Sequence, residues 1–249
     1  MNARCAVALA AALVLTLTGC DLPGRPRAAD RPVLPSQVTA FGPLYGRHCA
    51  GCHGADGRLG AARPLNDPVY LALIPPDRLR RTISQGVPGT PMPAFATAVG
   101  GVLTAVQVDA LVAGMLTRWA RPEAVKGLAL PPYDAEDAVA RGSGPGDPRR
   151  GADVYRVACA RCHGSDGKGG PQAGPVVDDA YLALASDQAL RTVVIAGRAD
   201  LGKPDWREDV PGQPLGPQQI SDVVAWLTAQ RRPVAGRPVS GADPGRPQP

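Results

Sequence analysis

The most regular hydrophobic pattern of the chain is helical and begins near residue 104. Thr104 and Gln107 match the capping box that starts many helices, and the apolar positions that follow fall on one helical face. These positions are Val108, Leu111, Val112, Met115, Leu116 and Trp119. The pattern predicts a helix that ends near residue 119.

Three shorter helices are predicted before this one. Leu44 and Tyr45 belong to the first. Asp67 is an N-cap residue followed by proline at the first helical position, which predicts the second. Pro76 begins the third, and Gly86 ends it. The sequence therefore predicts an all-α fold built from a small set of helices.

The whole pattern occurs twice along the chain. Tyr45 recurs as Tyr155, 110 positions later, and matches at an offset of 110 or 111 continue in order to the final helix. An ordered set of matches at a constant offset indicates duplication of one domain. We therefore predict tandem domains at residues 39–121 and 147–232.

The remaining segments are rich in small residues, Pro and Arg and show no apolar period. The sequence contains 30 Gly and 28 Pro, and such clusters are typical of tethers and linkers. We expect a disordered tether at residues 20–38, a solvated and mostly extended linker at 122–146, and a disordered tail at 233–249.

Residues 1–19 have the pattern of a signal peptide, with Arg4 ahead of an apolar run that is too short to cross a bilayer. The run leads to Cys20 in a sequence that resembles the lipobox of bacterial lipoproteins, where the cysteine thiol carries a lipid. The resemblance implies an exported protein that is anchored through Cys20. Its expected place is the periplasmic face of the inner membrane, or the outer face of the cell membrane in a Gram-positive organism. A secreted protein with a cysteine near its cleavage site is the alternative.

Two cysteine motifs mark corresponding positions of the two repeats. The residues are Cys49, Cys52 and His53 in the first repeat and Cys159, Cys162 and His163 in the second. C-x-x-C-H is the attachment signature of c-type haem, in which two thiols add to the vinyl groups and the histidine binds the iron. Four thiolates could instead bind one zinc ion as two C-x-x-C pairs. Because the pairs lie 110 residues apart, in separate repeats and each followed by histidine, haem is the favoured interpretation.

With Met92 and the final helix of each repeat, these motifs resemble those of class I c-type cytochromes. The resemblance covers both repeats. It implies that three to five helices wrap around one haem in each repeat, so that the chain carries two covalently attached haem c groups. It also implies that one haem edge lies near the surface, where an electron can leave.

Met92 is the expected sixth ligand of the first haem. Its thioether is a soft donor that favours ferrous iron and raises the reduction potential, and the flanking prolines hold it in a rigid loop. Met115 lies on the apolar face of the last helix and is expected to be a core residue. His48 is interpreted as a surface residue.

The second repeat departs from this pattern because no methionine follows His163. Lys203 stands 111 positions after Met92, where the sixth ligand is expected. A lysine amine binds iron only when neutral, and from a reference pKa near 10.4 its deprotonation at pH 7 costs about 4.6 kcal/mol. Ligation of iron by His163 and Lys203 is one expectation. The other is that Lys203 points to water and that the iron is five-coordinate or binds water.

Charge and composition restrict the classes of molecule that are expected to bind this chain. The formal net charge is +5 and aromatic residues make up 4% of the chain, and no basic run with interleaved aromatic residues suggests nucleic acid. The family resemblance implies a membrane-anchored carrier of single electrons. Its expected redox partners are a quinol-oxidising complex and a terminal oxidase or another cytochrome.

Two other functions fit the same residues. Two-haem peroxidases and thiosulfate dehydrogenases pair a relay haem with a reactive haem of unusual ligation, and the second repeat would supply the reactive one. The chain could also be a fixed haem-carrying subunit of a respiratory complex. Neither an acid–base pair nor a substrate pocket is visible in the sequence.

Overall fold

The computed structural model describes residues 32–232, and over this range the chain is helical and contains no strand. The all-α prediction is confirmed. The signal peptide, Cys20 and the tail at 233–249 lie outside the described residues. The chain forms two units that meet at residues 37 and 38. The short 3-10 helix η2 (Pro35–Gln37) belongs to the first unit, and both repeats belong to the second, which begins at Val38.

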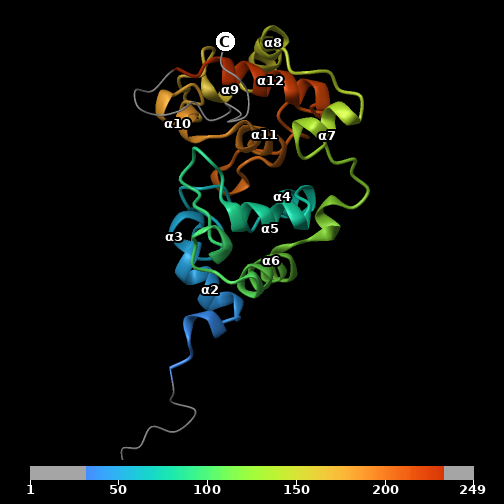
Figure 1. Ribbon diagram of the computed structural model, residues 1–249. Helices are drawn as coiled ribbons and strands as arrows, with labels where there is room; N and C mark the ends of the chain where they lie inside the picture. The colour runs from blue at the N-terminus through green and yellow to red at the C-terminus, as the bar shows by residue number, and fades with distance from the viewer. Residues whose placement is uncertain (1–31, 233–249) are drawn as a thin grey trace, which may run out of the picture. The chain divides into compact units, whose positions relative to one another are not determined.

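The two repeats contain the same elements in the same order (Figure 1). The first consists of α2 (Phe41–His48), α3 (Ala50–His53), α4 (Pro68–Leu73), α5 (Pro76–Gln85), η3 (Thr97–Val99) and α6 (Ala105–Trp119). The second consists of α8 (Pro148–Ala158), α9 (Ala160–His163), α10 (Asp179–Leu184), α11 (Asp187–Ala196), η5 (Ala199–Leu201) and α12 (Pro217–Ala229). This one-to-one correspondence is what duplication of a domain requires.

The predicted helix boundaries follow from the capping residues. The side chain of Asp67 accepts a hydrogen bond from the Tyr70 amide at 2.7 Å and starts α4. Thr104 and Gln107 form both hydrogen bonds of the capping box at α6. Gly86 ends α5 with φ 67°, a left-handed value that glycine adopts without a steric cost.

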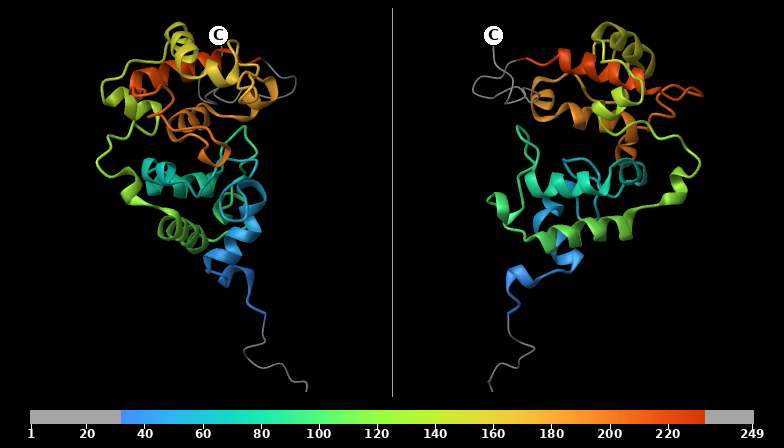
Figure 2. Two further views of the ribbon diagram at one scale, coloured as in Figure 1. Left: turned by 180° about the vertical axis from the view of Figure 1, so that it is seen from behind. Right: turned by 45° about the vertical axis from the view of Figure 1, so that its right-hand side comes forward.

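In each repeat the first long helix packs against the last one, and a glycine allows the close approach. In the first repeat a β-carbon on Gly114 of α6 would overlap the Phe41 ring of α2. In the second repeat the small residue is on the other helix: Gly151 of α8 takes the position of Phe41, and a β-carbon there would overlap the Asp222 carbonyl and lie 2.7 Å from Trp226 Cβ. Figures 1 and 2 show α8 lying against α12 and crossing it.

The linker between the repeats contains two short helices, which the prediction of a mostly extended segment did not include. It contains the 3-10 helix η4 (Pro122–Val125) and the α-helix α7 (Ala135–Ala140). Asp134 caps α7, because its side chain accepts a hydrogen bond from the Asp137 amide at 2.7 Å. Acidic residues in the first turn stabilise this short helix further by opposing its dipole.

The linker is also fastened to both repeats. Arg191 of α11, which is 2% exposed, donates two hydrogen bonds to the Pro132 carbonyl at 3.2 and 3.0 Å. The Gln188 side chain donates to the Tyr133 carbonyl at 2.8 Å. From the first repeat, Arg78 of α5 pairs with Asp134 at 3.2 Å. Residues 132–134 therefore form a strap across α5 and α11.

A second set of contacts joins the loop at residues 59–63 to the second repeat, and we call it the junction. The Leu59 amide donates to the Asp200 carboxylate at 3.1 Å. Arg63 donates to the Ala189 carbonyl at 3.2 Å. Arg198 pairs with Asp200 at 2.9 Å and holds the pKa of that carboxyl below its usual range. The junction thus fixes a loop of the first repeat to the start of α11 and to η5.

None of the helices in the described part of the chain is both long and apolar enough to span a bilayer.

Candidate haem-attachment sites

Each C-x-x-C-H motif follows the first helix of its repeat. Cys49 and Cys159 lie between two helices, and each amide donates at 2.9 Å to the carbonyl of the tyrosine four residues earlier. The second cysteine and the histidine lie on the short helix that follows. All four thiols are free, and each is at least partly exposed. The motifs thus present two accessible thiols and an imidazole from consecutive turns.

A backbone carbonyl orients each motif histidine. His53 Nδ1 lies 2.8 Å from the Arg63 carbonyl oxygen, and His163 Nδ1 lies 2.7 Å from that of Gly174. Since a carbonyl can only accept, Nδ1 carries the proton in both rings and Nε2 is left for a metal. Burial lowers the pKa of His53, which favours the neutral ring that binds iron. These side chains therefore fit a c-type haem in both repeats.

The loop after each motif is held by a tyrosine. The Tyr45 hydroxyl donates to the Gly54 carbonyl at 2.8 Å, and Tyr155 donates to Gly164 at 2.6 Å. Burial raises the pKa of both phenols, that of Tyr155 to about 12. Both hydroxyls therefore stay protonated and act as donors.

The structure does not bring the four thiols together. No group of three or more His, Cys, Asp or Glu side chains that could hold a metal ion occurs within residues 32–232. The cysteines stand as one pair in each repeat, which is the arrangement that haem attachment uses.

Met92 lies half-buried in the loop that follows α5. Its carbonyl accepts from the Val87 amide at 3.0 Å, and its amide donates to the Thr90 hydroxyl at 3.3 Å. Its ligation of iron stays a prediction. Met115 is 1% exposed in the core, as expected. His48 is not a simple surface residue, because its ring is half-buried and lies 6.1 Å from that of Phe95.

Lys203 occupies the place of Met92 in the backbone as well as in the sequence. The Lys203 carbonyl accepts from the Arg198 amide at 3.1 Å, just as Met92 accepts from Val87. Gly197, like Gly86 in the first repeat, has a positive φ and packs against this loop so closely that no side chain would fit. The two loops are therefore built alike and differ in the side chain that they present.

The Lys203 ammonium is paired with an acidic residue that the sequence analysis did not single out. Nζ donates to Asp209 Oδ1 at 3.1 Å and to the Pro204 carbonyl at 2.9 Å. Asp209 is 5% exposed, and burial raises its pKa while Lys203 opposes the change. Ligation of iron by Lys203 stays a prediction. To bind iron, the lysine would have to leave this ion pair.

Both charges of this pair act on the nearest attachment cysteine. Burial and, after it, the Asp209 carboxylate raise the pKa of the Cys159 thiol to about 12, whereas the Lys203 ammonium lowers it. The ion pair therefore lies within electrostatic reach of the haem-attachment site of the second repeat.

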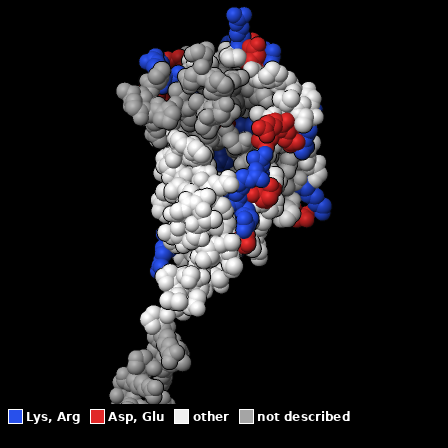
Figure 3. Space-filling model, in the orientation of Figure 1, with Lys and Arg blue, Asp and Glu red and all other residues white. Residues whose placement is uncertain are grey.

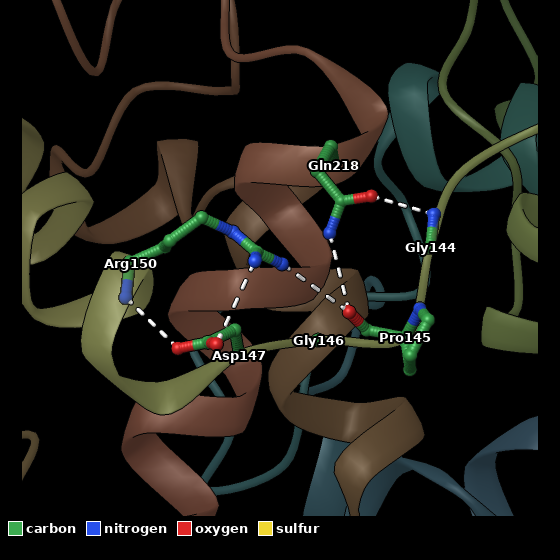
Figure 4. A pocket seen from close by; sticks show the side chains of 6 residues that line it. All are labelled: Gly144, Pro145, Gly146, Asp147, Arg150 and Gln218. Carbon is green, nitrogen blue, oxygen red and sulfur yellow. Dashed lines mark hydrogen bonds and ion pairs between the residues drawn. The ribbon is translucent and has the colours of Figure 1, made fainter.

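A surface hollow of about 490 Å³ lies at the start of α8 and is lined by none of the motif residues (Figure 4). Its polar groups bond to one another. Arg150 pairs with Asp222 at 2.8 Å, and Gln218 bonds to the Gly144 amide and to Asp222 at 2.6 and 2.9 Å. Because these side chains bond to one another, the hollow is not a candidate site.

Tandem helical repeats that each present a C-x-x-C-H motif with an oriented histidine define a class I c-type cytochrome. A comparison with protein families agrees. The chain belongs to the family described as cytochrome c oxidase, cbb3-type, subunit III, which it matches over residues 36–113 and 146–227.

Curated relatives carry related names. The cbb3-type cytochrome c oxidase subunit FixP of Sinorhizobium medicae is 29% identical over 61% of this chain and 48% of its own length. Subunit CcoP of Rubrivivax gelatinosus is 29% identical over 81% of this chain and 58% of its own length. Dihydro-heme d1 dehydrogenase of Pseudomonas aeruginosa is 44% identical over 28% of this chain and 13% of its own length. The chain thus spans 58% or less of each of these relatives.

Proposed function

We propose that the chain is a two-haem cytochrome that transfers single electrons in a respiratory chain. Cys49 and Cys52 would hold the first haem, and His53 and Met92 would bind its iron. Cys159, Cys162 and His163 hold the second haem. When bound, each haem supplies one-electron redox chemistry. The residues of the chain would hold the groups and orient the imidazoles.

The observation that carries this proposal is the pair of histidine–carbonyl hydrogen bonds, at 2.8 and 2.7 Å. They occur at corresponding places in both repeats and leave the same ring nitrogen for iron. A partner of this kind orients a metal-binding histidine and makes it a better donor.

Haem stoichiometry tests the proposal directly. The chain should be produced with a c-type haem maturation system, and bound haem measured after denaturation as the pyridine complex. We expect two covalent haems per wild-type chain and one in each of the double variants Cys49→Ser/Cys52→Ser and Cys159→Ser/Cys162→Ser, which lack both thiols of one motif. A wild-type chain with one haem or none would contradict the proposal.

The partner is proposed from the relatives, whose names place them in cbb3-type cytochrome c oxidases. We propose that this chain donates electrons to a terminal oxidase, either as a fixed subunit or as a carrier supplied by a quinol-oxidising complex. Charged side chains are few over α2 and α3 on the face in Figure 3, which offers a neutral docking surface.

Stopped-flow oxidation by the oxidase should be faster than oxidation by an unrelated small oxidant. Co-purification at constant stoichiometry would identify a fixed subunit.

We also propose that Cys20 carries a lipid that holds the protein at the outer side of the inner membrane. The support is the sequence Leu17-Thr18-Gly19-Cys20 behind an apolar run. Cell fractionation with a radiolabelled fatty acid tests this. The wild-type chain should be labelled and membrane-bound, and Cys20→Ala should be unlabelled.

A second candidate function is a two-haem oxidoreductase whose second haem is the reactive centre. The observation in its favour is Lys203 in the place of the sixth ligand, engaged by Asp209. Steady-state assays with hydrogen peroxide and with thiosulfate separate the two functions. Turnover with either substrate favours the enzyme, and its absence with both favours the electron carrier.

A further inference from the structure

The loop that presents Lys203 differs from its counterpart in more than one side chain. In the first repeat, residues 96–102 follow Phe95 and contain no charged residue. In the second repeat, the segment after Trp206 contains Arg207, Glu208 and Asp209. The second repeat therefore has both a lysine at the ligand position and a carboxylate to receive it.

The charges of this loop form two separate pairs. Arg207 pairs with Asp205 through bonds of 2.9 and 2.6 Å. Lys203 pairs with Asp209 at 3.1 Å. Asp205 is engaged by Arg207, and Asp209 is the carboxylate of this loop that Lys203 contacts.

Several features hold Lys203 in this pair. Asp209 is 5% exposed, so release of the lysine would leave a buried carboxylate without its ion-pair partner, which is strongly destabilising. Nζ has a second acceptor in the Pro204 carbonyl at 2.9 Å. An ammonium that donates both bonds has no lone pair for a metal.

The second repeat offers no replacement ligand of the usual kind. The sequence contains no methionine after Met115 and no histidine after His163, so residues 147–232 supply neither a thioether nor a second imidazole. The Tyr155 hydroxyl is engaged with the Gly164 carbonyl.

On the basis of the proposed function, in which the second repeat carries a haem, we propose that Asp209 retains Lys203 and leaves the iron with an open coordination position. This position takes a small exogenous haem ligand, a neutral diatomic molecule in the ferrous state or a small anion in the ferric state. The site is thus a ligand-binding centre, and Asp209 is a positioning residue that acts through Lys203.

Carbon monoxide and cyanide are the probes for the test. The haem-loaded full chain is reduced and titrated with carbon monoxide, followed by its visible absorption. The oxidised chain is examined by low-temperature EPR, with and without cyanide. We expect one of the two haems to bind carbon monoxide, and one high-spin ferric haem that becomes low-spin with cyanide. Two low-spin ferric haems and no carbon monoxide binding would overturn the proposal.

Variants separate the roles of the two side chains. Lys203→Ala should bind carbon monoxide like the wild type, and binding that appears only in this variant would show that the lysine is the ligand. Lys203→Met should lose carbon monoxide binding at least tenfold, because a thioether then fills the position. Asp209→Asn should increase the low-spin fraction of the second haem, whereas an unchanged fraction would remove the positioning role of Asp209.

Arg207→Gln is the matched control, because it breaks the other ion pair of the loop and should leave both spectra unchanged. Haem content separates this inference from the proposed function. Fewer than two haems per chain would contradict the proposed function. Two haems that are both low-spin would overturn only the present proposal.

Discussion

His53 and His163 are each oriented by a single backbone atom. Each ring donates from Nδ1 to a carbonyl ten or eleven residues further on. A hydrogen bond of this kind fixes the ring and raises its basicity. The motifs themselves were predicted from the sequence, but these acceptors were not. Every residue has a carbonyl, so neither Arg63 nor Gly174 carries a signal for this role.

Substitution of Met92 tests its assignment at the same scale. We expect Met92→Ala to lower the reduction potential of the first haem on the order of 0.1 V, because a thioether stabilises ferrous iron and axial ligands tune haems over about 0.8 V. A spectroelectrochemical titration measures the change. Met115→Leu is the control, because it keeps the core volume and should leave the potential unchanged. Equal potentials in wild type and Met92→Ala would remove Met92 from the ligand set.

Arg81 of α5 and Arg191 of α11 lie on corresponding helices of the two repeats and have different roles. Arg191 is 2% exposed and bonded to the linker, whereas the Arg81 side chain is 51% exposed. We expect Arg191→Leu to lower the free energy of unfolding by about 1–3 kcal/mol, because the buried Pro132 carbonyl loses its donors. Arg81→Leu should change it by about 0.5 kcal/mol or less. Thermal and denaturant unfolding measure the free energy of unfolding of both variants. Equal losses of this free energy in the two variants would show that the strap does not depend on Arg191.

At the scale of elements, the sequence was most informative where one residue determines a boundary. Asp67, Thr104 and Gly86 each place a helix end through a local hydrogen bond or a backbone angle, and all three were predicted. The linker helix α7 was missed. Its N-cap Asp134 was visible, but the helix is six residues long and has too little apolar pattern to be recognised. It depends on a strap held by residues from two other helices.

The packing of α8 on α12 makes a prediction about Gly151. A β-carbon at this position would overlap the Asp222 carbonyl, so we expect Gly151→Ala to destabilise the protein by about 1–3 kcal/mol through overpacking. Gly46 of α2 is the control, because nothing lies within 4 Å of a β-carbon there. Gly46→Ala should stabilise the protein by about 0.5–1 kcal/mol through helix propensity. Melting temperatures that move in the same direction would contradict the packing argument.

At the scale of the whole molecule, the contacts between the repeats had no sequence signal. The Leu59 amide and the Asp200 carboxylate are 141 positions apart, and Arg63 and Ala189 are 126 apart. Such pairs depend on how two folded domains pack against each other. The hydrophobic periodicity within one domain carries no information about that packing. For the same reason the strap across α5 and α11 could not be predicted from the sequence.

The junction can be tested through one amide. In Asp200→Asn the charged acceptor of the Leu59 amide is lost, and Arg198 loses its ion pair. We expect hydrogen exchange at the Leu59 amide to become about tenfold faster, which corresponds to about 1.4 kcal/mol of protection. Asp205→Asn is the control, because its bonds stay within its own loop. Unchanged exchange in Asp200→Asn would show that this contact does not hold the loop.

The junction should also depend on pH. The hydrogen bond from Arg198 holds the pKa of Asp200 below its usual range, so ionised Asp200 stabilises the folded chain. This stabilisation is complete above the ordinary carboxyl pKa of about 4 and is lost as the pH falls through the lower folded value. Exchange at the Leu59 amide, corrected for its intrinsic pH dependence, should therefore accelerate only below about pH 4. Acceleration that begins near neutral pH would contradict the assignment to Asp200.

Arg63 takes part in two of these structures at once. Its carbonyl accepts from His53, and its guanidinium donates to Ala189 of the second repeat. One residue thus contacts both α11 and the imidazole of the other domain. With a haem in each repeat, as proposed above, the reduction potential of the first haem should depend on whether the second domain is folded beside it.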